Sequence, residues 1–360
     1  QALTLGATAR SRADSDRAEP VVLGHGVGLF EVGALLFRDD FEDLDNWIVQ
    51  VQDRDGGRAP SIRAVESSLD CLVPGRGCTV WFKQKLKGRV TISYDVVCPT
   101  PEPEIGGVQP RDINNFWMAS DPDDPERGLF DPDKYTGAFS SYDKMHGYYA
   151  STGGGKNTTT RMRRYPREVD GAPAEHLALT ARDGDQDYLI TPDKVMRVQL
   201  VAYDDVIQYI VDGKLNYEIA RGDQIQIEGR DAGGKRVMRD GTYNLERLPV
   251  YHEGYFGFRM VGTHHVYSNF RVHRLEPAQR EVAVSSIGEL REVMGLSNQR
   301  VVMEPGIYTV DELVDGGAGF HLSGSHNHFD LSGVTIRMPI STLRKQERRG
   351  RRGDAEPPRF

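Results

Sequence analysis

The chain has 360 residues, of which 38% are hydrophobic and 27% are charged, and its formal net charge is −8. This length and balance suit a globular protein with one large domain or two smaller ones, and they exclude a disordered chain. The negative charge argues against a nucleic-acid partner, and no apolar run approaches the roughly 20 residues of a membrane span. We therefore expect a soluble protein with no nucleic-acid partner and no membrane span.

Residues 1–34 have no strong period and are predicted to be a lead-in segment. From residue 35, short runs of β-branched and aromatic residues alternate with turns rich in Gly and Asp, a pattern typical of an antiparallel sandwich. The run Val211-Asp212-Gly213-Lys214 is a hairpin signal. The predicted strands include 47–52, 79–86, 89–97, 195–203, 206–211 and 255–261.

Cys71 and Cys78 flank a turn-like segment between two strand-like runs. A hairpin there would bring the two thiols together, and a Cys71–Cys78 disulfide would imply an oxidising compartment. Two reduced thiols in a cytosolic protein are the alternative. Cys98 is predicted to be a small buried hydrophobic residue.

Residues 114 to 165 combine aromatic, amide and basic residues on three predicted strands, 114–118, 145–151 and 158–165. Because side chains alternate between the two faces of a strand, Phe116 and Met118 are predicted to point into a core. One sheet surface would then carry Asn115, Trp117, His146, Tyr148, Arg161 and Arg163. Such a surface suits an extended, anionic, sugar-like ligand.

A boundary is predicted near Glu276-Pro277. Beyond it, Ser286 is a candidate N-cap for a helix that runs to Met294. The short strand-like runs that follow, without hairpin signals, favour the stacked coils of a parallel β-solenoid. The predicted domains are thus 35–276 and 285–344, followed by a basic tail, 345–360, that is expected to be disordered.

Two resemblances rest on particular residues. Segments 195–214, 254–259 and 268–272, with Arg38-Asp39-Asp40-Phe41-Glu42, resemble concanavalin A-like β-sandwiches over residues 35 to 275. Within that region, the block from Asn115 to Arg161 is similar to a bacterial secreted family of poorly defined role, found beside carbohydrate-degrading enzymes. Segments 285–290, 305–308 and 327–334 resemble the opening of a right-handed parallel β-helix of the chondroitinase and alginate-lyase type.

These resemblances imply an all-β chain. Its main part would be a concanavalin A-like antiparallel β-sandwich, or jelly roll, followed by a short C-terminal parallel β-helix fragment. They also imply a secreted or periplasmic location. The catalytic coils of the β-helix enzymes lie beyond the segments that match, so no catalytic residue is carried over to that part.

The candidate surface predicts a polysaccharide lyase. Cleaving a uronate glycan by β-elimination needs a group that neutralises the carboxylate, a base and an acid. Arg161 or Arg163 is predicted to neutralise the carboxylate, and His146 and Tyr148, two apart on one strand, are predicted to transfer the protons. The candidate substrate contacts are Asn115, Trp117, Tyr149, Asn157, Arg163 and Arg259. The expected partner is an acidic polysaccharide or oligosaccharide.

Two other functions stay open. In a non-catalytic carbohydrate-binding domain attached to a β-helix enzyme, Trp117 and Tyr148 would stack on sugar rings. A glycoside hydrolase would need two carboxylates across the scissile bond, and acidic residues are few on the predicted strands.

No cofactor is required by any of these functions. Asp39 and Asp40 lie where this fold often places a structural Ca²⁺, and they are candidate ligands. The acidic loop 121–134 is predicted to be solvated. His264 and His265 are adjacent on a strand and should face opposite sides, so they are not expected to share a metal ion.

Overall fold

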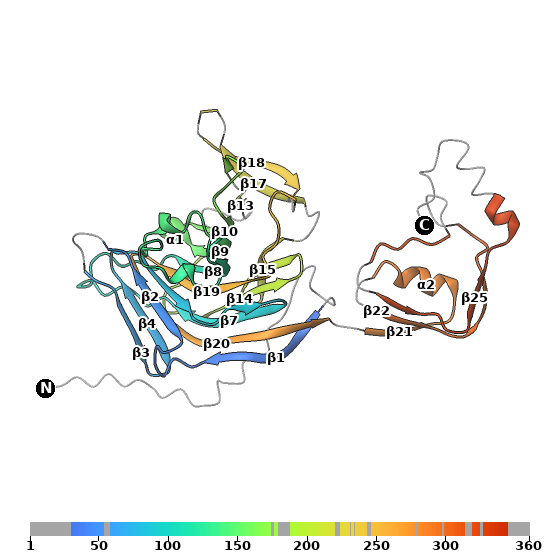
Figure 1. Cartoon of the computed structure of the whole chain (residues 1–360), viewed down its shortest axis with the longest axis horizontal. Helices are drawn as coiled ribbons and strands as arrows, with labels where there is room; N and C mark the ends of the chain where they lie inside the picture. The colour runs from blue at the N-terminus through green and yellow to red at the C-terminus, as the bar shows by residue number, and fades with distance from the viewer. Residues whose placement is uncertain are drawn as a thin grey trace. The chain divides into compact units, whose positions relative to one another are not determined.

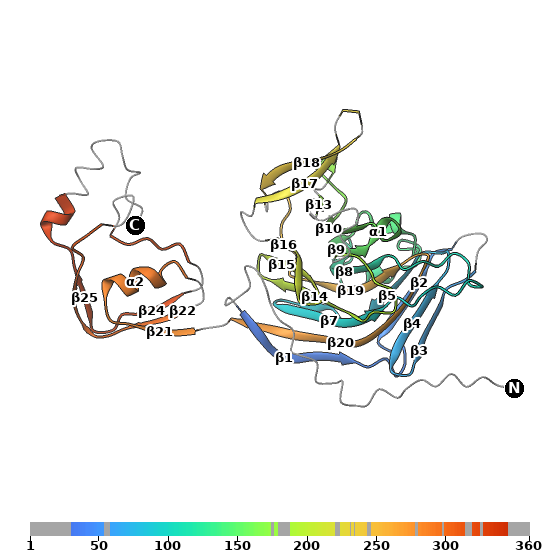
Figure 2. The ribbon, with the colours of Figure 1, turned by 180° about the vertical axis from the view of Figure 1, so that it is seen from behind.

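The computed structural model describes residues 30–344 except for 54–57, 174–175, 179–187, 220–223, 231, 234, 243–245, 278–279, 297–298, 314–318 and 325–326. Contacts divide the chain into two compact units, of which the first contains Val32–Leu275 and the second contains the residues from Glu276 onward. The two units are drawn from opposite sides in Figures 1 and 2. Most of the predicted lead-in and the whole predicted tail lie outside the described residues, and the first strand already begins at Phe30.

The first unit is a sandwich of two antiparallel sheets, so the predicted antiparallel β architecture is confirmed. Within the described residues one sheet has eight strands in the order β16-β15-β14-β7-β20-β4-β3, with β1 paired to β20. Their bounds are β1 (Phe30–Asp39), β3 (Ser61–Val65), β4 (Ser68–Val73), β7 (Val90–Val97), β14 (Met196–Tyr203), β15 (Val206–Val211), β16 (Lys214–Ile219) and β20 (Thr263–Pro277).

The other sheet has ten strands among the described residues, in the order β18-β17-β13-β10-β9-β8-β19-β5-β2, with β6 paired to β19. Their bounds are β2 (Trp47–Val51), β5 (Cys78–Phe82), β6 (Leu86–Lys87), β8 (Ile113–Ser120), β9 (His146–Gly153), β10 (Thr159–Tyr165), β13 (His176–Ala178), β17 (Gln224–Arg230), β18 (Arg236–Thr242) and β19 (Glu253–Met260). A separate small hairpin joins β11 (Glu168–Val169) to β12 (Ala172–Pro173).

The main core lies between the two sheets and is filled by every second side chain of their strands. In β7, Val90, Ile92, Tyr94 and Val96 all belong to this core. Aromatic rings dominate its centre: Trp47 stacks on Phe258 with ring centroids 5.4 Å apart. Burial of such rings removes a large apolar area from water and stabilises the sandwich.

The ten-stranded sheet also carries an apolar cluster on its outer face. Trp81, Phe116 and Tyr149 project there from the sheet, and Tyr135 and Tyr142 cover them from the connection between β8 and β9. That connection contains the 3-10 helices η3 (Gly128–Phe130) and η4 (Phe139–Tyr142). The sheet is therefore buried on both faces in this region.

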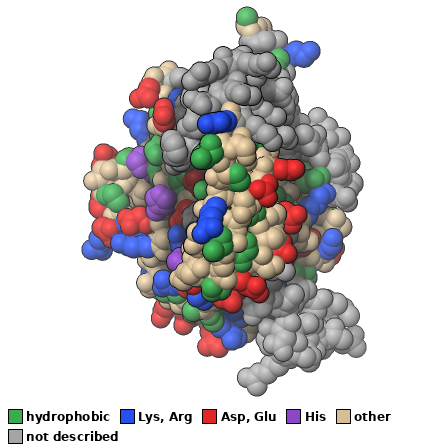
Figure 3. Space-filling view, turned by 90° about the vertical axis from the view of Figure 1, so that its right-hand side faces the viewer, with side chains coloured by type: hydrophobic (Ala, Val, Ile, Leu, Met, Phe, Trp, Pro, Cys, Tyr) green, Lys and Arg blue, Asp and Glu red, His purple; other side chains and the backbone are tan. Residues whose placement is uncertain are grey.

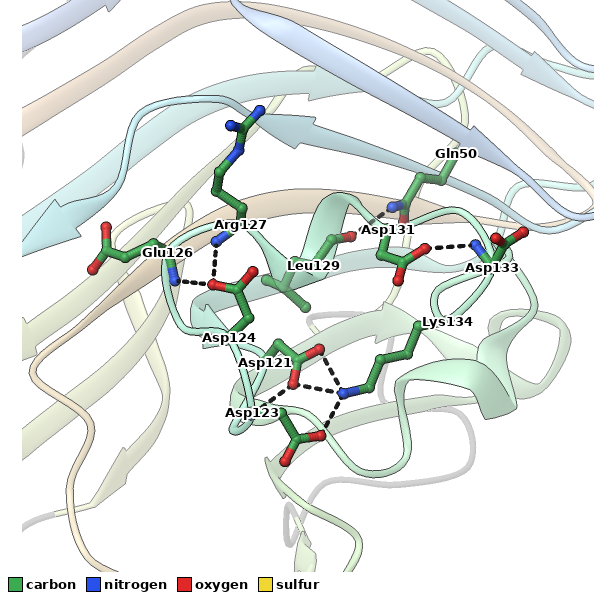
Figure 4. A network of polar contacts seen from close by, with 10 residues as sticks. All are labelled: Gln50, Asp121, Asp123, Asp124, Glu126, Arg127, Leu129, Asp131, Asp133 and Lys134. Atoms are coloured by element: carbon green, nitrogen blue, oxygen red, sulfur yellow. Dashed lines mark hydrogen bonds and ion pairs between the residues drawn. The ribbon is translucent and has the colours of Figure 1, made fainter.

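The acidic loop at the start of that connection is not simply solvated, as Figure 4 shows. Asp121 is only 2% exposed, and its carboxylate accepts hydrogen bonds from the Lys134 ammonium at 2.8 Å and from the Asp123 backbone N–H at 2.8 Å. Burial raises the pKa of Asp121, but these donors outweigh it, so the pKa lies below its usual value. Lys134 also contacts Asp123 at 2.7 Å, so an ammonium group occupies the space between the two carboxylates.

Replacing Lys134 by Met should leave the buried Asp121 carboxylate without its cation. We expect the free energy of unfolding to fall by about 1–3 kcal/mol, less than for a fully buried pair because Lys134 is partly exposed. Chemical denaturation measures this loss, with the exposed Lys144→Met as the control. A Lys134→Met protein as stable as the control would show that the ion pair contributes nothing.

The predicted disulfide between Cys71 and Cys78 is wrong for this structure, because both residues and Cys98 are buried free thiols. The connection 74–77 does not close a hairpin. It carries the chain from β4 in the eight-stranded sheet to β5 in the ten-stranded sheet. Burial raises the pKa of Cys78 to about 12, which keeps this thiol protonated and unreactive at neutral pH. Cys98 is buried as predicted.

The two-residue turn at Asp212-Gly213 is confirmed. Val211 pairs with Lys214, and both turn residues have positive φ, 51° and 74°. This left-handed geometry matches the twist of the flanking strands.

The second unit contains parallel strand pairs. β21 (Arg280–Val284), β22 (Gln299–Met303) and β24 (His328–Asp330) form one parallel sheet, and β23 (Gly306–Thr309) pairs in parallel with β25 (Val334–Arg337). The predicted helix is confirmed as α2 (Ile287–Val293). The Ser286 hydroxyl accepts the Glu289 backbone N–H at 3.1 Å, and the Glu289 carboxylate accepts the Ser285 N–H at 2.7 Å.

Charged groups of both signs are mixed on the face drawn in Figure 3, where blue and red side chains lie next to one another. The described charged side chains on this face are therefore not gathered into one acidic field. Among the described residues, no helix is long and apolar enough to cross a membrane.

Candidate functional site

A cavity of about 440 Å³ opens on the outer face of the ten-stranded sheet. It lies beside the covering connection, since Phe139 of η4 forms part of its wall. Its charged side chains among the described residues are Arg111, Arg161, Arg163, Arg259 and Asp112, a formal excess of three positive charges. Asn114, Tyr149, Ser151, Thr158 and Thr159 add polar groups. We call this the arginine cavity.

Strand register brings the floor of the arginine cavity together from four strands. Asn114 of β8 lies opposite Arg259 of β19 and Ser151 of β9, and Ser151 lies opposite Arg161 of β10. Two residues along, Tyr149 lies opposite Arg163. Residues in register across neighbouring strands share a face, so these side chains converge on one surface.

Arg259 is the most deeply buried of the four arginines, with 3% of its surface exposed. Its Nη1 donates to the Cys78 carbonyl oxygen at 3.1 Å and to the Met260 carbonyl oxygen, while its Nε has no partner within the protein. The guanidinium carbon lies 5.5 Å from the centre of the Phe139 ring. The surrounding backbone holds this cation in place without neutralising it.

Arg163 and Tyr149 form a second contact in the cavity. The Arg163 guanidinium carbon lies 5.6 Å from the centre of the Tyr149 ring, and the Arg163 Nε is buried without a hydrogen-bond partner. Burial raises the pKa of Tyr149, and Arg163 partly opposes that rise. Tyr149 is therefore a protonated phenol at neutral pH.

Asp112 is the one carboxylate among the described residues that line the cavity. It is 7% exposed and accepts a hydrogen bond from Arg111 Nε at 2.5 Å. Burial raises the pKa of Asp112, and Arg111 counteracts part of the rise. Its backbone has φ 59°, and its N–H donates to the Gly153 carbonyl oxygen at 3.2 Å.

Gly153 begins a left-handed turn that forms one wall of the cavity. This turn includes α1 (Gly154–Asn157), and Gly155, Lys156 and Asn157 all have positive φ. The Asn157 amide donates to the Ile190 carbonyl at 2.8 Å and accepts the Ile190 N–H at 2.9 Å. The predicted substrate contact Asn157 instead anchors the turn to the segment around Ile190.

The prediction that six side chains share one surface is wrong. Arg161 and Arg163 line the arginine cavity, whereas Trp117 and Tyr148 belong to the core between the sheets. Asn115 is also fully buried, and its Oδ1 accepts a hydrogen bond from the Tyr94 hydroxyl. The prediction assigned the two faces of this strand the wrong way round. Phe116 faces the outer cluster, so its neighbours Asn115 and Trp117 face inward.

The two residues predicted to transfer protons lie away from the cavity. The half-buried His146 ring stacks on Tyr251 with centroids 5.0 Å apart, and the Tyr251 backbone N–H donates to the Tyr148 hydroxyl oxygen at 3.0 Å. Burial, together with the nearby Arg164, lowers the pKa of His146. Burial raises the pKa of Tyr148. This group packs the margin of the core and does not face Arg161.

The candidate calcium ligands are already occupied by protein donors. The Asp39 carboxylate accepts from the Phe41 N–H at 2.7 Å and from Trp47 Nε1 at 2.9 Å, and Asp40 pairs with Arg38 at 2.5 Å and Arg271 at 3.0 Å. Calcium takes six to eight oxygen ligands, so binding here would require these donors to rearrange, and the calcium site stays a prediction. Across the part of the chain that the structure describes, no group of three or more His, Cys, Asp or Glu could hold a metal ion.

Several cavity residues escaped the sequence prediction: Arg111, Asp112, Asn114 and Ser151. Strand alternation could have indicated one of them, because Ser151 lies two residues from Tyr149 on the same strand. Arg111, Asp112 and Asn114 join the cavity through strand pairing, which gives no local signal. Tyr149, Arg163 and Arg259, predicted as substrate contacts, do line the cavity.

The first unit is thus an antiparallel β-sandwich with an arginine-lined cavity on one sheet. Residues 72–229 match the model of a domain of unknown function, DUF6250. No curated protein matches the chain.

Several solved structures are similar to this chain. A Bacillus subtilis protein of unknown function with a galectin-like fold is 18% identical, with a TM-score of 0.48, and the match covers 69% of this chain and 100% of that one. An endo-β-1,3-glucanase from Pyrococcus furiosus is 10% identical, with coverages of 68% and 95% and a TM-score of 0.40. The carbohydrate-binding module CBM66 from Bacillus subtilis is 13% identical, with coverages of 63% and 95% and a TM-score of 0.36.

Proposed function

We propose that the sandwich binds an acidic glycan in the arginine cavity. The observation that carries this proposal is the convergence of four arginines on one cavity whose described lining has a single carboxylate. Two of the arginines, Arg163 and Arg259, keep a buried Nε without a partner. A guanidinium group presents several donors in one plane and matches the two oxygens of a carboxylate.

The other lining residues suit a sugar better than a small inorganic anion. Phe139 and Tyr149 offer aromatic surface, and Ser151, Thr158 and Thr159 offer hydroxyl groups. Ligand pockets commonly combine apolar surface with a few polar groups that fix orientation. A uronate ring can use both, because its carboxylate meets the arginines while its ring and hydroxyls meet the remaining wall.

Arg163→Ala should weaken the binding of an acidic glycan about 10- to 100-fold. The substitution removes a charge-assisted contact of roughly 1.5–3 kcal/mol. Isothermal titration with polygalacturonate, alginate, hyaluronate and a neutral glucan measures the effect and selects the ligand. Binding by the wild-type protein should also weaken as salt rises.

Arg167→Ala is the matched control, because Arg167 pairs with Asp143 at 3.7 Å and does not line the cavity. It should bind like the wild type. Equal affinity for the neutral glucan and the acidic polymers, or an Arg163→Ala variant that binds normally, would contradict the proposal.

Polysaccharide lyase activity is the second candidate. The predicted trio is divided, since Arg161 lines the cavity and His146 and Tyr148 do not. What favours an elimination is that Tyr149, whose phenol can donate a proton, lines the same cavity as the arginines. The accumulation of an unsaturated, ultraviolet-absorbing product tests it. A glycoside hydrolase is less well supported, because the described lining residues include one carboxylate rather than two.

We also propose that the second unit is the opening of a right-handed parallel β-helix. The support is its parallel register, in which Val301 of β22 pairs with Val282 on one side and Phe329 on the other. A secreted or periplasmic location, where acidic glycans are met, belongs to the same proposal.

A further inference from the structure

We propose that the arginine cavity is catalytic, with Asp112 as the base and Tyr149 as the acid of a β-elimination on a uronate ring. This inference rests on the proposed function, because the glycan must first bind in the cavity. It assigns the proton transfers to two residues that flank the cavity floor. His146 and Tyr148 have no part in it.

Strand register places the two groups on opposite sides of a common centre. Asp112, directly before β8, and Asn114 of β8 both line the cavity, as do Ser151 and Tyr149 of β9. Asn114 pairs with Ser151, so Asp112 lies beyond one end of this pair and Tyr149 beyond the other. A sugar ring seated over Asn114 and Ser151 would have the carboxylate at one edge and the phenol at the other. Arg161 and Arg259 extend the same row and can hold the uronate carboxylate.

The surroundings favour the proton transfer that each role needs. Burial raises the pKa of Asp112, which makes its carboxylate a stronger base than an exposed one, and Arg111 opposes part of that rise. Burial also keeps Tyr149 protonated, so it can donate a proton. Asp112 holds a left-handed backbone conformation, φ 59°, of the kind often found at functional sites.

The proposed elimination conserves atoms and charge and needs no cofactor. The Asp112 carboxylate takes the proton from C5 of the uronate, and that C–H electron pair forms the C4–C5 double bond. The C4–O4 bond breaks, and O4 takes the proton of the Tyr149 hydroxyl. Arg161 and Arg259 stabilise the negative charge that develops on the carboxylate. Proton exchange with solvent then returns Asp112 to carboxylate and Tyr149 to phenol.

The test uses the full chain and the acidic polymer, among polygalacturonate, alginate and hyaluronate, that binds it most tightly. Wild-type protein should generate the unsaturated product, measured by ultraviolet absorbance. Tyr149→Phe, which removes one oxygen atom, should lower turnover about 10²- to 10⁴-fold and leave Kd within about threefold. Asp112→Asn should lower turnover similarly. Asp170→Asn, an exposed aspartate outside the cavity, should change neither quantity.

The outcomes separate this inference from the proposed function. A polymer that binds through Arg163 but yields no unsaturated product overturns the catalytic assignment and leaves the binding function standing. Product formed at the wild-type rate by Tyr149→Phe also overturns the assignment, because the proton would then come from another group. If none of the three polymers binds, the proposed function fails, and the catalytic inference fails with it.

Discussion

Gly77→Ala should lower both the stability of the sandwich and its affinity for an acidic glycan. A Cβ at Gly77 would lie 2.4 Å from Arg259 Nη2 and 2.6 Å from the Gly137 carbonyl oxygen. The backbone cannot retreat easily, because Gly77 N–H donates to Gln52 Oε1 at 3.1 Å and the Gly77 carbonyl accepts the Gln52 N–H at 2.8 Å. The methyl group must therefore displace Arg259 or distort the segment around it.

We expect the free energy of unfolding to fall by about 1–3 kcal/mol, the usual cost of overpacking a buried site. Glycan binding should weaken about tenfold or more, because Arg259 forms part of the cavity. Denaturant titration and calorimetric titration measure the two effects. The matched control is Gly75→Ala in the same connection, where a Cβ meets nothing within 4 Å. Normal binding by a folded Gly77→Ala protein would show that the position of Arg259 is unimportant.

The sequence predicted the strands well because alternation in a sandwich is a local signal. The run 90–97 places an apolar side chain at every second position, and β7 has those bounds. The hairpin at Asp212-Gly213 and the Ser286 cap are similarly local. Each depends on a few neighbouring residues, whose backbone preferences a single sequence reveals.

The orientation of the functional strands was harder to predict, because the ten-stranded sheet is buried on both faces. Phe116 and Trp117 are equally apolar, and only the packing of Tyr135 and Tyr142 on the outer face explains why Phe116 points outward. A bulge between Trp117 and Ser120, with Met118 at φ 49°, then breaks the alternation. The segment that covers the outer face is rich in Pro and Asp, a composition that favours a loop. Its sequence therefore gave no periodic pattern to indicate that the outer face of the sheet is also buried.

The cavity itself depends on pairing between residues far apart in the chain. Arg259 lies 145 positions after Asn114, yet the two are register partners. The order of the strands in a sheet decides which residues become neighbours, and no single segment of the sequence determines that order. The sequence therefore indicated arginines and aromatic residues as ligand contacts without showing which of them share a face.

Acid should destabilise the sandwich through His265. This ring is fully buried in β20, with Nε2 2.9 Å from the Arg111 carbonyl oxygen and Nδ1 2.8 Å from the Tyr267 hydroxyl. Because the Arg111 carbonyl can only accept, Nε2 carries the proton and Nδ1 accepts from Tyr267. Burial, with a smaller effect of the neighbouring His264, lowers the pKa of His265 to about 3.

The unfolded chain binds a proton at His265 near pH 6.5, whereas the folded protein resists protonation until about pH 3. The stability linked to this neutral imidazole is therefore present above pH 6.5 and falls as the pH drops toward 3, by about 4 kcal/mol over the whole window. His265→Gln, which does not titrate, should be less stable at pH 7 but should lose stability less steeply between pH 6.5 and 3. The control is His264→Gln, at the partly exposed neighbouring residue that contacts Asp70. This variant should lose stability as steeply as the wild type when the pH falls from 6.5 to 3. Denaturation midpoints across this pH range measure the slopes, and parallel curves for wild type and His265→Gln would show that the buried imidazole is not the acid-sensitive group.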